Sequence, residues 1–341
     1  MDHKFTGPSY TIGIEEELMI LDAETLELAN AIEAMLEEPT VEGGEIKPEL
    51  HESVLEVATE PCPGTPEETE RIADSKHLIF EGMVKAAETG SVHEDQVGVL
   101  VDEQFGGDVP AQAKARGLKL AMPVEKSGQN EFDFEYGDAF GEHIEKFDPD
   151  FSKVLVRYNP EDDAEVNQRQ LGKLKRLADW LHEHDRKFLF ELLVPATDEQ
   201  LASVGGDTGR FDAELRPELM RRAIEETQAF GCEVDIWKIE GVDAREDAET
   251  LARQTRSGEG RENVVCVLLG RGASDEKVDQ WLRVAAPVQG FVGFAIGRSI
   301  WWDALKGFLD GSLAREDAAQ RIADNYLRFI RVYEEQETAV A

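Results

Sequence analysis

Short apolar runs alternate with longer amphipathic stretches along most of the chain. Seven runs rich in β-branched and aromatic residues predict buried strands, at residues 97–102, 118–125, 153–158, 187–195, 235–241, 263–270 and 290–297. Helical spacing of the apolar positions predicts helices at 67–89, 162–184, 275–285 and 314–336. This alternation is typical of a parallel sheet with helices on its outer face.

The pattern predicts an α/β fold, a (β/α)8 barrel, which needs one more strand before residue 97. The segment VLEVATE at 54–60 is the candidate, so the first strand is atypical. Two alternatives follow: this segment closes the barrel, or a seven-stranded barrel keeps an open edge. Thr197 and Gln200 form an expected capping box, as do Thr65 and Glu68.

The first 61 residues form no complete βα unit and are more acidic than the rest. They contain the strand-like run YTIGIEEELMILD, a loop or short helix, and the run EIKPELHESVLEVATE. The turn-forming cluster Cys62-Pro63-Gly64 marks the boundary. We therefore expect an acidic α+β extension at 1–61 and the barrel at 62–341.

The amino-acid composition argues against several classes of protein. The 72 acidic residues outnumber the 36 basic ones, giving a net charge of -36, which argues against binding to nucleic acid or to an anionic membrane. An apolar content of 41% argues against disorder, so the acidity predicts a carboxylate surface suited to high salt, as in halophilic proteins. The three cysteines have no disulfide or zinc spacing. Without an apolar leader or a run of 18 apolar residues, we expect a cytoplasmic protein, and self-association stays open.

Three predicted strands carry a charged residue between apolar neighbours of the same face. These residues are Lys153, Glu191 and Lys238. Burial beside a second cation lowers the pKa of a lysine, and a neutral amine can form a Schiff base with a carbonyl. We predict that Lys238 is this nucleophile, that Lys153 is the second cation, and that Glu191 moves protons. A Lys-Glu-Lys network with a structural role is the alternative.

The ends of the last two strands favour a phosphate site. Gly270 and Arg271 follow one strand, and Gly297 and Arg298 follow the other and open a helix. Bare backbone amides at such ends commonly hold phosphate in this fold. Ordinary strand-to-helix turns are the alternative.

Further polar residues could contact substrate. Asp102 and Lys126 stand in or at the root of polar loops after the first two predicted strands, and Arg157 shares the inward face of Lys153. In so acidic a protein, plain surface loops are an equal alternative for the first two.

The run GIEEEL and the segment HESVLEV could supply carboxylates to Mg²⁺. The residues are Glu15, Glu17, Glu52 and Glu56. A solvated acidic edge is the alternative that composition favours.

The larger part of the chain resembles a known family. The segments GVLVDEQFG, LAMPVEKSGQNEFDFEYGD, KVLVRYNPEDD, FLFELLVP, DIWKIEG and GFAIGRSIWW are similar, in this order, to the class I aldolase-like barrel of certain 5-dehydro-2-deoxygluconokinases of inositol catabolism, relatives of tagatose-bisphosphate aldolase. The resemblance implies Schiff-base chemistry at Lys238 with Glu191 and Lys153, and phosphate binding at Gly270 and at Gly297-Arg298. The family's first strand, with its Asp-His-Arg, is missing here.

The N-terminal part resembles a different family. TIGIEEELMILD and KPELHESVLEVATEPC are similar to the opening of type-2 glutamate-cysteine ligases, also called carboxylate-amine ligases. The resemblance implies metal and ATP chemistry for Glu15, Glu17 and Glu52, and it ends near residue 62, before the nucleotide-binding part of that fold.

Together these features predict a Schiff-base aldolase acting on a phosphorylated keto-sugar or keto-sugar acid, with 6-phospho-5-dehydro-2-deoxygluconate suggested by the relatives. No cofactor or metal is expected to be required. A carboxylate-amine ligase and a non-catalytic fusion with a truncated barrel are the alternatives.

Overall fold

A computed structural model of the protein describes residues 10–12, 15–19, 44–48, 54–59, 62–64, 66–90, 92, 96–103, 106–271 and 273–337. The chain forms two compact units, Met1–Asp74 and Ser75–Ala341.

The first unit contains short antiparallel strands. β1 (Tyr10–Ile12) pairs with β5 (Cys62–Gly64). β4 (Val54–Thr59) lies between β2 (Glu15–Met19) and β3 (Gly44–Pro48) and bonds to both.

The prediction that segment 54–60 is the first strand of the barrel is therefore wrong. Both edges of β4 are already hydrogen-bonded within the three-stranded antiparallel sheet, so this strand has no free edge for a parallel partner. The open-edged alternative is the one observed among the described residues.

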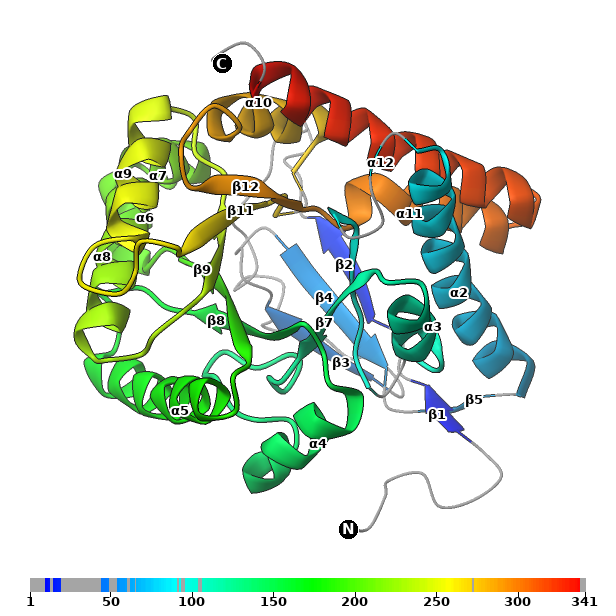
Figure 1. The fold of residues 1–341 in the computed structure, drawn as a ribbon, viewed down its shortest axis with the longest axis horizontal. Helices are drawn as coiled ribbons and strands as arrows, with labels where there is room; N and C mark the ends of the chain where they lie inside the picture. Colours follow the sequence, from blue (N-terminus) through cyan, green and yellow to red (C-terminus); the bar gives the residue numbers. More distant parts are fainter. Residues whose placement is uncertain are drawn as a thin grey trace. The chain divides into compact units, whose positions relative to one another are not determined.

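The second unit contains a seven-stranded parallel sheet that curls into a half-barrel (Figure 1). Its strands follow one another in chain order: β6 (Gly98–Leu100), β7 (Lys119–Pro123), β8 (Phe151–Arg157), β9 (Lys187–Leu193), β10 (Ile236–Glu240), β11 (Val265–Leu269) and β12 (Phe291–Ala295). All seven predicted strands are confirmed. In the described part of the chain, β6 and β12 are the edges of this sheet.

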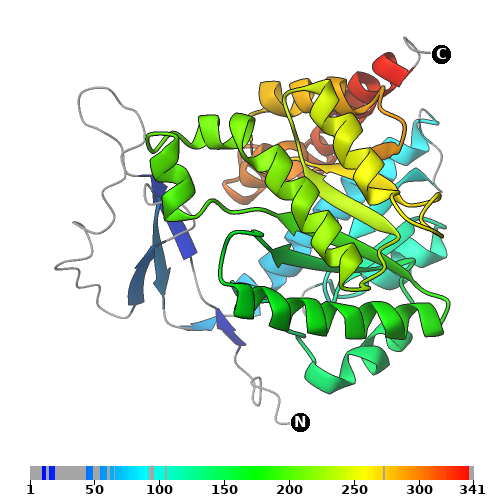
Figure 2. The same ribbon diagram turned by 90° about the vertical axis from the view of Figure 1, so that its left-hand side faces the viewer.

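Helices surround the convex side of the curled sheet (Figures 1 and 2). They are α2 (Pro66–Glu88), α3 (Val109–Ala115), α4 (Phe140–Phe147), α5 (Ala164–Glu183), α6 (Asp198–Ser203), α7 (Thr208–Glu214), α8 (Arg216–Ala229), α9 (Arg245–Thr255), α10 (Asp275–Ala285), α11 (Arg298–Leu309) and α12 (Arg315–Glu337), with a 3-10 turn at Gly137–Ala139. The four predicted helices are confirmed, as is the capping box of Thr197 and Gln200 that opens α6. Thr65 lies outside the described residues.

The two faces of the central strands have opposite character. The residues that face the helices are apolar and almost fully buried, among them Val154, Phe190 and Trp237. The residues between them point to the inside of the curl and include the charged side chains of Lys153, Glu191 and Lys238, which are also buried. The core thus lies between sheet and helices, and the concave face is left for polar chemistry.

Cys232 and Cys266 are buried free thiols, and Cys62 lies in β5. Within the described ranges, no helix is both long and apolar enough to cross a membrane.

Candidate functional site

Three adjacent strands bring the predicted chemical residues together. β9 lies between β8 and β10, and Glu191 stands level with Lys238 on one side and with Leu155 on the other. Lys153 precedes Leu155 by two residues, so its side chain shares the same face. Because side chains alternate between the two faces of a strand, the sequence positions of Lys153, Glu191 and Lys238 are sufficient to place all three on the same face.

The side chains form a continuous chain of ion pairs. Glu191 accepts from Lys238 through Oε1, at 2.9 Å from Nζ, and from Lys153 through Oε2, at 3.0 Å. Lys153 also contacts Glu125 Oε1, at 2.5 Å. We call Glu125, Lys153, Glu191 and Lys238 the lysine cluster. All four side chains are buried or nearly so, which strengthens the electrostatic interaction between them.

Burial and neighbouring charges act differently on the two lysines. Burial lowers the pKa of Lys238, and the positive charge of Lys153 lowers it further, against the attraction of Glu191. Burial also opposes the charge of Lys153, but its two carboxylate neighbours outweigh this and raise its pKa. Lys238 is therefore the lysine that gives up its proton more readily.

The two carboxyl groups are also unequal. Burial opposes the charge of Glu191, but Lys153 and Lys238 together lower its pKa. Burial raises the pKa of Glu125, whose Oε2 is buried without a hydrogen-bond partner. The charged form of Glu191 is thus favoured by its two lysine neighbours, whereas burial opposes the charged form of Glu125.

Chemically, this arrangement offers a nucleophile and a base in contact. A neutral amine can attack a carbonyl carbon, and a carboxylate at hydrogen-bond distance can take and return the protons that this addition releases.

The sequence places Glu125 only at the root of a polar loop that could line a substrate pocket. Glu125 follows β7 by two residues and forms an isolated bridge with Phe134. Pro123 stands level with Lys153, so continuing the alternation from Pro123 to Glu125 could have placed this carboxylate on the inner face.

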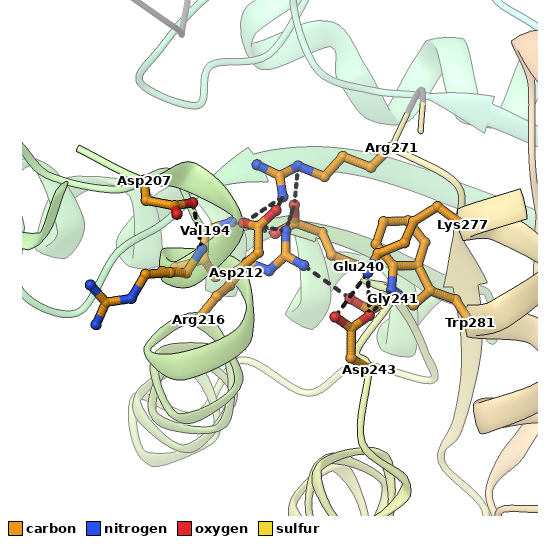
Figure 3. A network of polar contacts seen from close by, with 11 residues as sticks. Val194, Asp207, Asp212, Arg216, Glu240, Gly241, Asp243, Arg271, Lys277 and Trp281 are labelled. Atoms are coloured by element: carbon orange, nitrogen blue, oxygen red, sulfur yellow. Dashed lines mark hydrogen bonds and ion pairs between the residues drawn. The ribbon is translucent and has the colours of Figure 1, made fainter. Parts of the chain in front are cut away.

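A second buried ionic cluster lies at the carboxyl end of β10 (Figure 3). Glu240 accepts from Arg216 at 3.2 Å, from Arg271 at 2.9 Å and from the backbone N–H of Val194 at 3.0 Å. Both arginines also pair with Asp212. We call Asp212, Arg216, Glu240 and Arg271 the arginine cluster. Burial raises the pKa of Glu240, although Arg216 stabilises its charge.

The arginine cluster is fixed to the surrounding loops. Arg216 donates to the carbonyl of Gly241 at 3.0 Å. A side chain at Gly241 would overlap the ring of Trp281, because a Cβ there would lie 2.1 Å from it. The indole N–H of Trp281 donates to Asp243, which also pairs with Lys277 (Figure 3). This glycine therefore allows the close packing that holds the end of β10. Arg216 was missed by the sequence analysis.

The predicted phosphate residues fall at two separate places. Gly270 follows β11 directly, and Arg271 comes next with a φ of 50°, which is uncommon for a residue with a side chain. Its guanidinium is paired with Asp212 and Glu240. Gly297 is the N-cap of α11, and Arg298 is its exposed first residue. Phosphate binding at these residues stays a prediction.

Asp102 follows β6, and Lys126 lies exposed in the turn after β7, where its backbone N–H donates to the carbonyl of Asp133. Arg157 ends β8 on the face of Lys153.

The acidic residues of the first unit lie on paired strands. Glu17 of β2 stands level with Glu56 of β4, and Glu15 begins β2. Glu52 lies outside the described residues. Their proposed role with Mg²⁺ stays a prediction.

The fold and the lysine cluster define a class of protein: a parallel α/β half-barrel that carries lysine and glutamate side chains in contact on its inner face. The chain belongs to the family described as "Uncharacterized protein conserved in bacteria (DUF2090)", whose model matches residues 56–337.

A short stretch is similar to curated proteins named "Putative glutamate--cysteine ligase 2". It is 51% identical over 55 residues to the one from Chloroflexus aggregans, and 44% identical over 54 residues to the one from Roseiflexus castenholzii. In both cases the match spans 16% of this chain and 14% of the relative.

Two solved structures are similar in fold. A structural genomics target from Corynebacterium glutamicum is 16% identical, with 72% of this chain and 76% of that chain covered and a TM-score of 0.47. Fructose-bisphosphate aldolase from Plasmodium falciparum, solved with TRAP and a small-molecule inhibitor, is 14% identical, with 79% and 96% covered and a TM-score of 0.47.

Proposed function

We propose that the protein is a class I aldolase in which Lys238 forms a Schiff base with a ketone. The observation that carries this proposal is the lysine cluster: a buried amine with a lowered pKa, 2.9 Å from a carboxylate that is itself held by a second lysine. Burial opposes the charged form of an amine. It therefore favours the neutral amine, which is the form that attacks carbonyls.

The reaction follows from this arrangement. Glu191 takes the proton that the ammonium group of Lys238 gives up, and the neutral amine adds to the ketone carbon. One amine proton and the proton held by Glu191 then pass to the carbinolamine oxygen, which leaves as water and gives a protonated iminium. The resulting iminium draws electrons from the adjacent carbon–carbon bond. Glu191 takes the proton of the hydroxyl group beyond that bond, the aldehyde departs, the electron pair remains as an enamine, and Glu191 holds the proton for the next step. Protonation of the enamine carbon and addition of water release the ketone product and restore the amine.

The substrate we propose is a phosphorylated keto-sugar or keto-sugar acid. The resemblance to the barrel of inositol catabolism suggests 6-phospho-5-dehydro-2-deoxygluconate, which would yield dihydroxyacetone phosphate and malonate semialdehyde. The iminium serves as the electron sink in such a mechanism, so the bond cleavage requires no metal.

A coupled assay for dihydroxyacetone phosphate tests the proposal. We expect release of this product from 6-phospho-5-dehydro-2-deoxygluconate by the unaltered protein and no release by Lys238→Met. Lys187→Met is the matched control, because Lys187 is an exposed residue at the start of β9. Equal activity in Lys238→Met would overturn the proposal.

The similarity to glutamate–cysteine ligases favours a second candidate, a carboxylate-amine ligase that uses Glu15, Glu17 and Glu52. Hydrolysis of ATP that depends on Mg²⁺ and an amino acid would support it, and Glu17→Gln should then abolish this hydrolysis. A folded protein without either activity would support a non-catalytic role.

A further inference from the structure

We call the carboxyl-terminal end of the curled sheet its mouth. Arg157 lies there, at the end of β8 and two residues beyond the position level with Glu191. On β8 and β9, Leu155 stands level with Glu191, and Arg157 stands level with Leu193. Because side chains alternate along a strand, Arg157 shares the inner face with Lys153 but lies nearer the carboxyl ends of the strands. In parallel barrels this end is where substrates bind.

The guanidinium of Arg157 is only partly satisfied. Its Nη1 donates to the carbonyl of Gln129 at 3.0 Å, which ties it to the loop after β7. Its Nε is buried and has no hydrogen-bond partner. No ion pair involves Arg157 among the described residues. A buried donor without a partner is unfavourable, so this group is suited to receive an acceptor from outside the chain.

Other arginines near this mouth differ from Arg157. Arg216 and Arg271 are neutralised by Glu240 and Asp212 (Figure 3). Arg298 is exposed at the start of α11, where water can satisfy its donors. Arg157 therefore combines partial burial with an uncompensated charge.

We infer that Arg157 binds the anionic group of the carbonyl substrate. This inference rests on the proposed function, because it places the anion relative to a ketone bound at Lys238. A guanidinium forms paired hydrogen bonds with either a carboxylate or a phosphate, so both anions share the required chemistry.

The register also limits the size of the substrate. β8 and β10 are second neighbours in the sheet, so their backbones lie roughly 10 Å apart. Arg157 also stands two residues beyond the position on β8 that is level with Lys238, so roughly 7 Å more separates the two backbones along the strands. The substrate is then a short ketone whose carboxylate or phosphate lies a few bonds from the carbonyl carbon.

Reductive trapping with borohydride tests this with matched pairs of ketones. Levulinate is compared with its neutral amide, and dihydroxyacetone phosphate with dihydroxyacetone. In the unaltered protein we expect half-maximal trapping at lower concentration for the anionic member of at least one pair. That pair tells whether a carboxylate or a phosphate is bound.

Arg157→Gln should raise the half-maximal concentration of the anionic ketone by roughly 10- to 100-fold, the usual effect of losing a hydrogen bond between charged groups. It should leave that of the neutral partner within about twofold. Arg157→Lys should retain part of the preference, since it keeps the positive charge but lacks the paired planar donors of a guanidinium. Arg253→Gln, which changes an exposed arginine on α9, is the control and should leave the preference unchanged. An equal effect of Arg157→Gln on both members of a pair would overturn the inference.

A binding measurement keeps this result separate from the proposed function. If no ketone is trapped by the unaltered protein, the proposed Schiff base fails. Levulinate and inorganic phosphate are then tested for raising the unfolding temperature. A rise that Arg157→Gln abolishes supports an anion site at Arg157, and the absence of a rise, or a rise that persists in Arg157→Gln, contradicts it.

Discussion

The lysine cluster and the arginine cluster meet on β10, where Lys238 and Glu240 are two residues apart, yet they have opposite properties. Both alternate cations and carboxylates in a buried setting, and Lys238 and Glu240 share one face of β10. Each lysine is a single point of charge, whereas each arginine offers several donors in a fixed plane. The arginines contact two carboxylates and a backbone carbonyl, which holds their positions firmly.

The difference shows what makes a buried ion pair reactive or structural. In the lysine cluster, burial lowers the pKa of Lys238 and so favours its neutral amine, the form that can attack a carbonyl. In the arginine cluster, the guanidinium groups stay charged at any relevant pH, and their carboxylate partners are fixed with them. We therefore expect substitutions in the first cluster to change chemistry and those in the second to change stability.

Lys238→Met should give the largest effect. Turnover should fall on the order of 10⁴-fold or more, because the nucleophile is gone. Stability should fall by no more than about 2 kcal/mol, since methionine fills similar volume and Glu191 keeps Lys153. Denaturant unfolding and turnover are measured on the same preparation, with Lys187→Met as control. A loss of folding with the loss of activity would assign Lys238 to a structural role.

Arg216→Met should lower stability more than turnover, the opposite of Lys238→Met. It removes a side chain that is 1% exposed and contacts Glu240, Asp212 and Gly241, so the free energy of unfolding should fall by about 3–5 kcal/mol. Arg210→Met is the matched control, because its pair with Glu214 is exposed to solvent and should contribute little to stability. Equal effects of the two variants in urea unfolding would contradict a structural role for the arginine cluster.

Glu191→Gln separates attack from proton transfer. The amide keeps the shape of the side chain but cannot accept the protons, so turnover should fall by roughly 10²- to 10⁴-fold. Trapping of a ketone on Lys238 should persist, because the amine remains. Glu183→Gln, at the end of α5, changes an exposed carboxylate and should leave turnover unchanged. Full turnover in Glu191→Gln would remove this residue from the mechanism.

Lys153→Met should produce the smallest effect, a shift in pH dependence. The trapping rate rises as Lys238 loses its proton, and Lys153 is one of the causes that lower the pKa of Lys238. Without that cation the pKa of Lys238 should rise, so the rate should increase only at higher pH than in the unaltered protein. Lys187→Met should leave the profile in place. A profile that is unchanged or moved to lower pH in Lys153→Met would show that Lys153 does not lower the pKa of Lys238.

Much of the second unit could be predicted from the sequence. Long apolar runs with β-branched residues identify all seven strands, because buried parallel strands need this composition. The contact of Lys238 with Glu191 follows from alternation and from the order of neighbouring strands. These features depend on local periodicity, which a single sequence contains.

The pairing of strands and of charged side chains that are distant in the sequence could not be predicted in the same way. The run at 54–60 has the composition of a strand, but composition does not tell whether it pairs in a parallel barrel or in the antiparallel sheet of β2, β4 and β3. Arg271 was identified as a cation, and its carboxylate partners Asp212 and Glu240 come from other elements. Arg216 stands on a helix, where periodicity does not single out the polar residue that turns inward.

The most direct measurement is the site of covalent labelling. The protein is incubated with dihydroxyacetone phosphate, reduced with borohydride and digested, and the modified peptide is identified by mass. We predict one label, on Lys238, that depends on the ketone and is absent from Lys238→Met. A label on another lysine would contradict an amine nucleophile at Lys238. The absence of any label on the folded protein after incubation with dihydroxyacetone phosphate would contradict it as well.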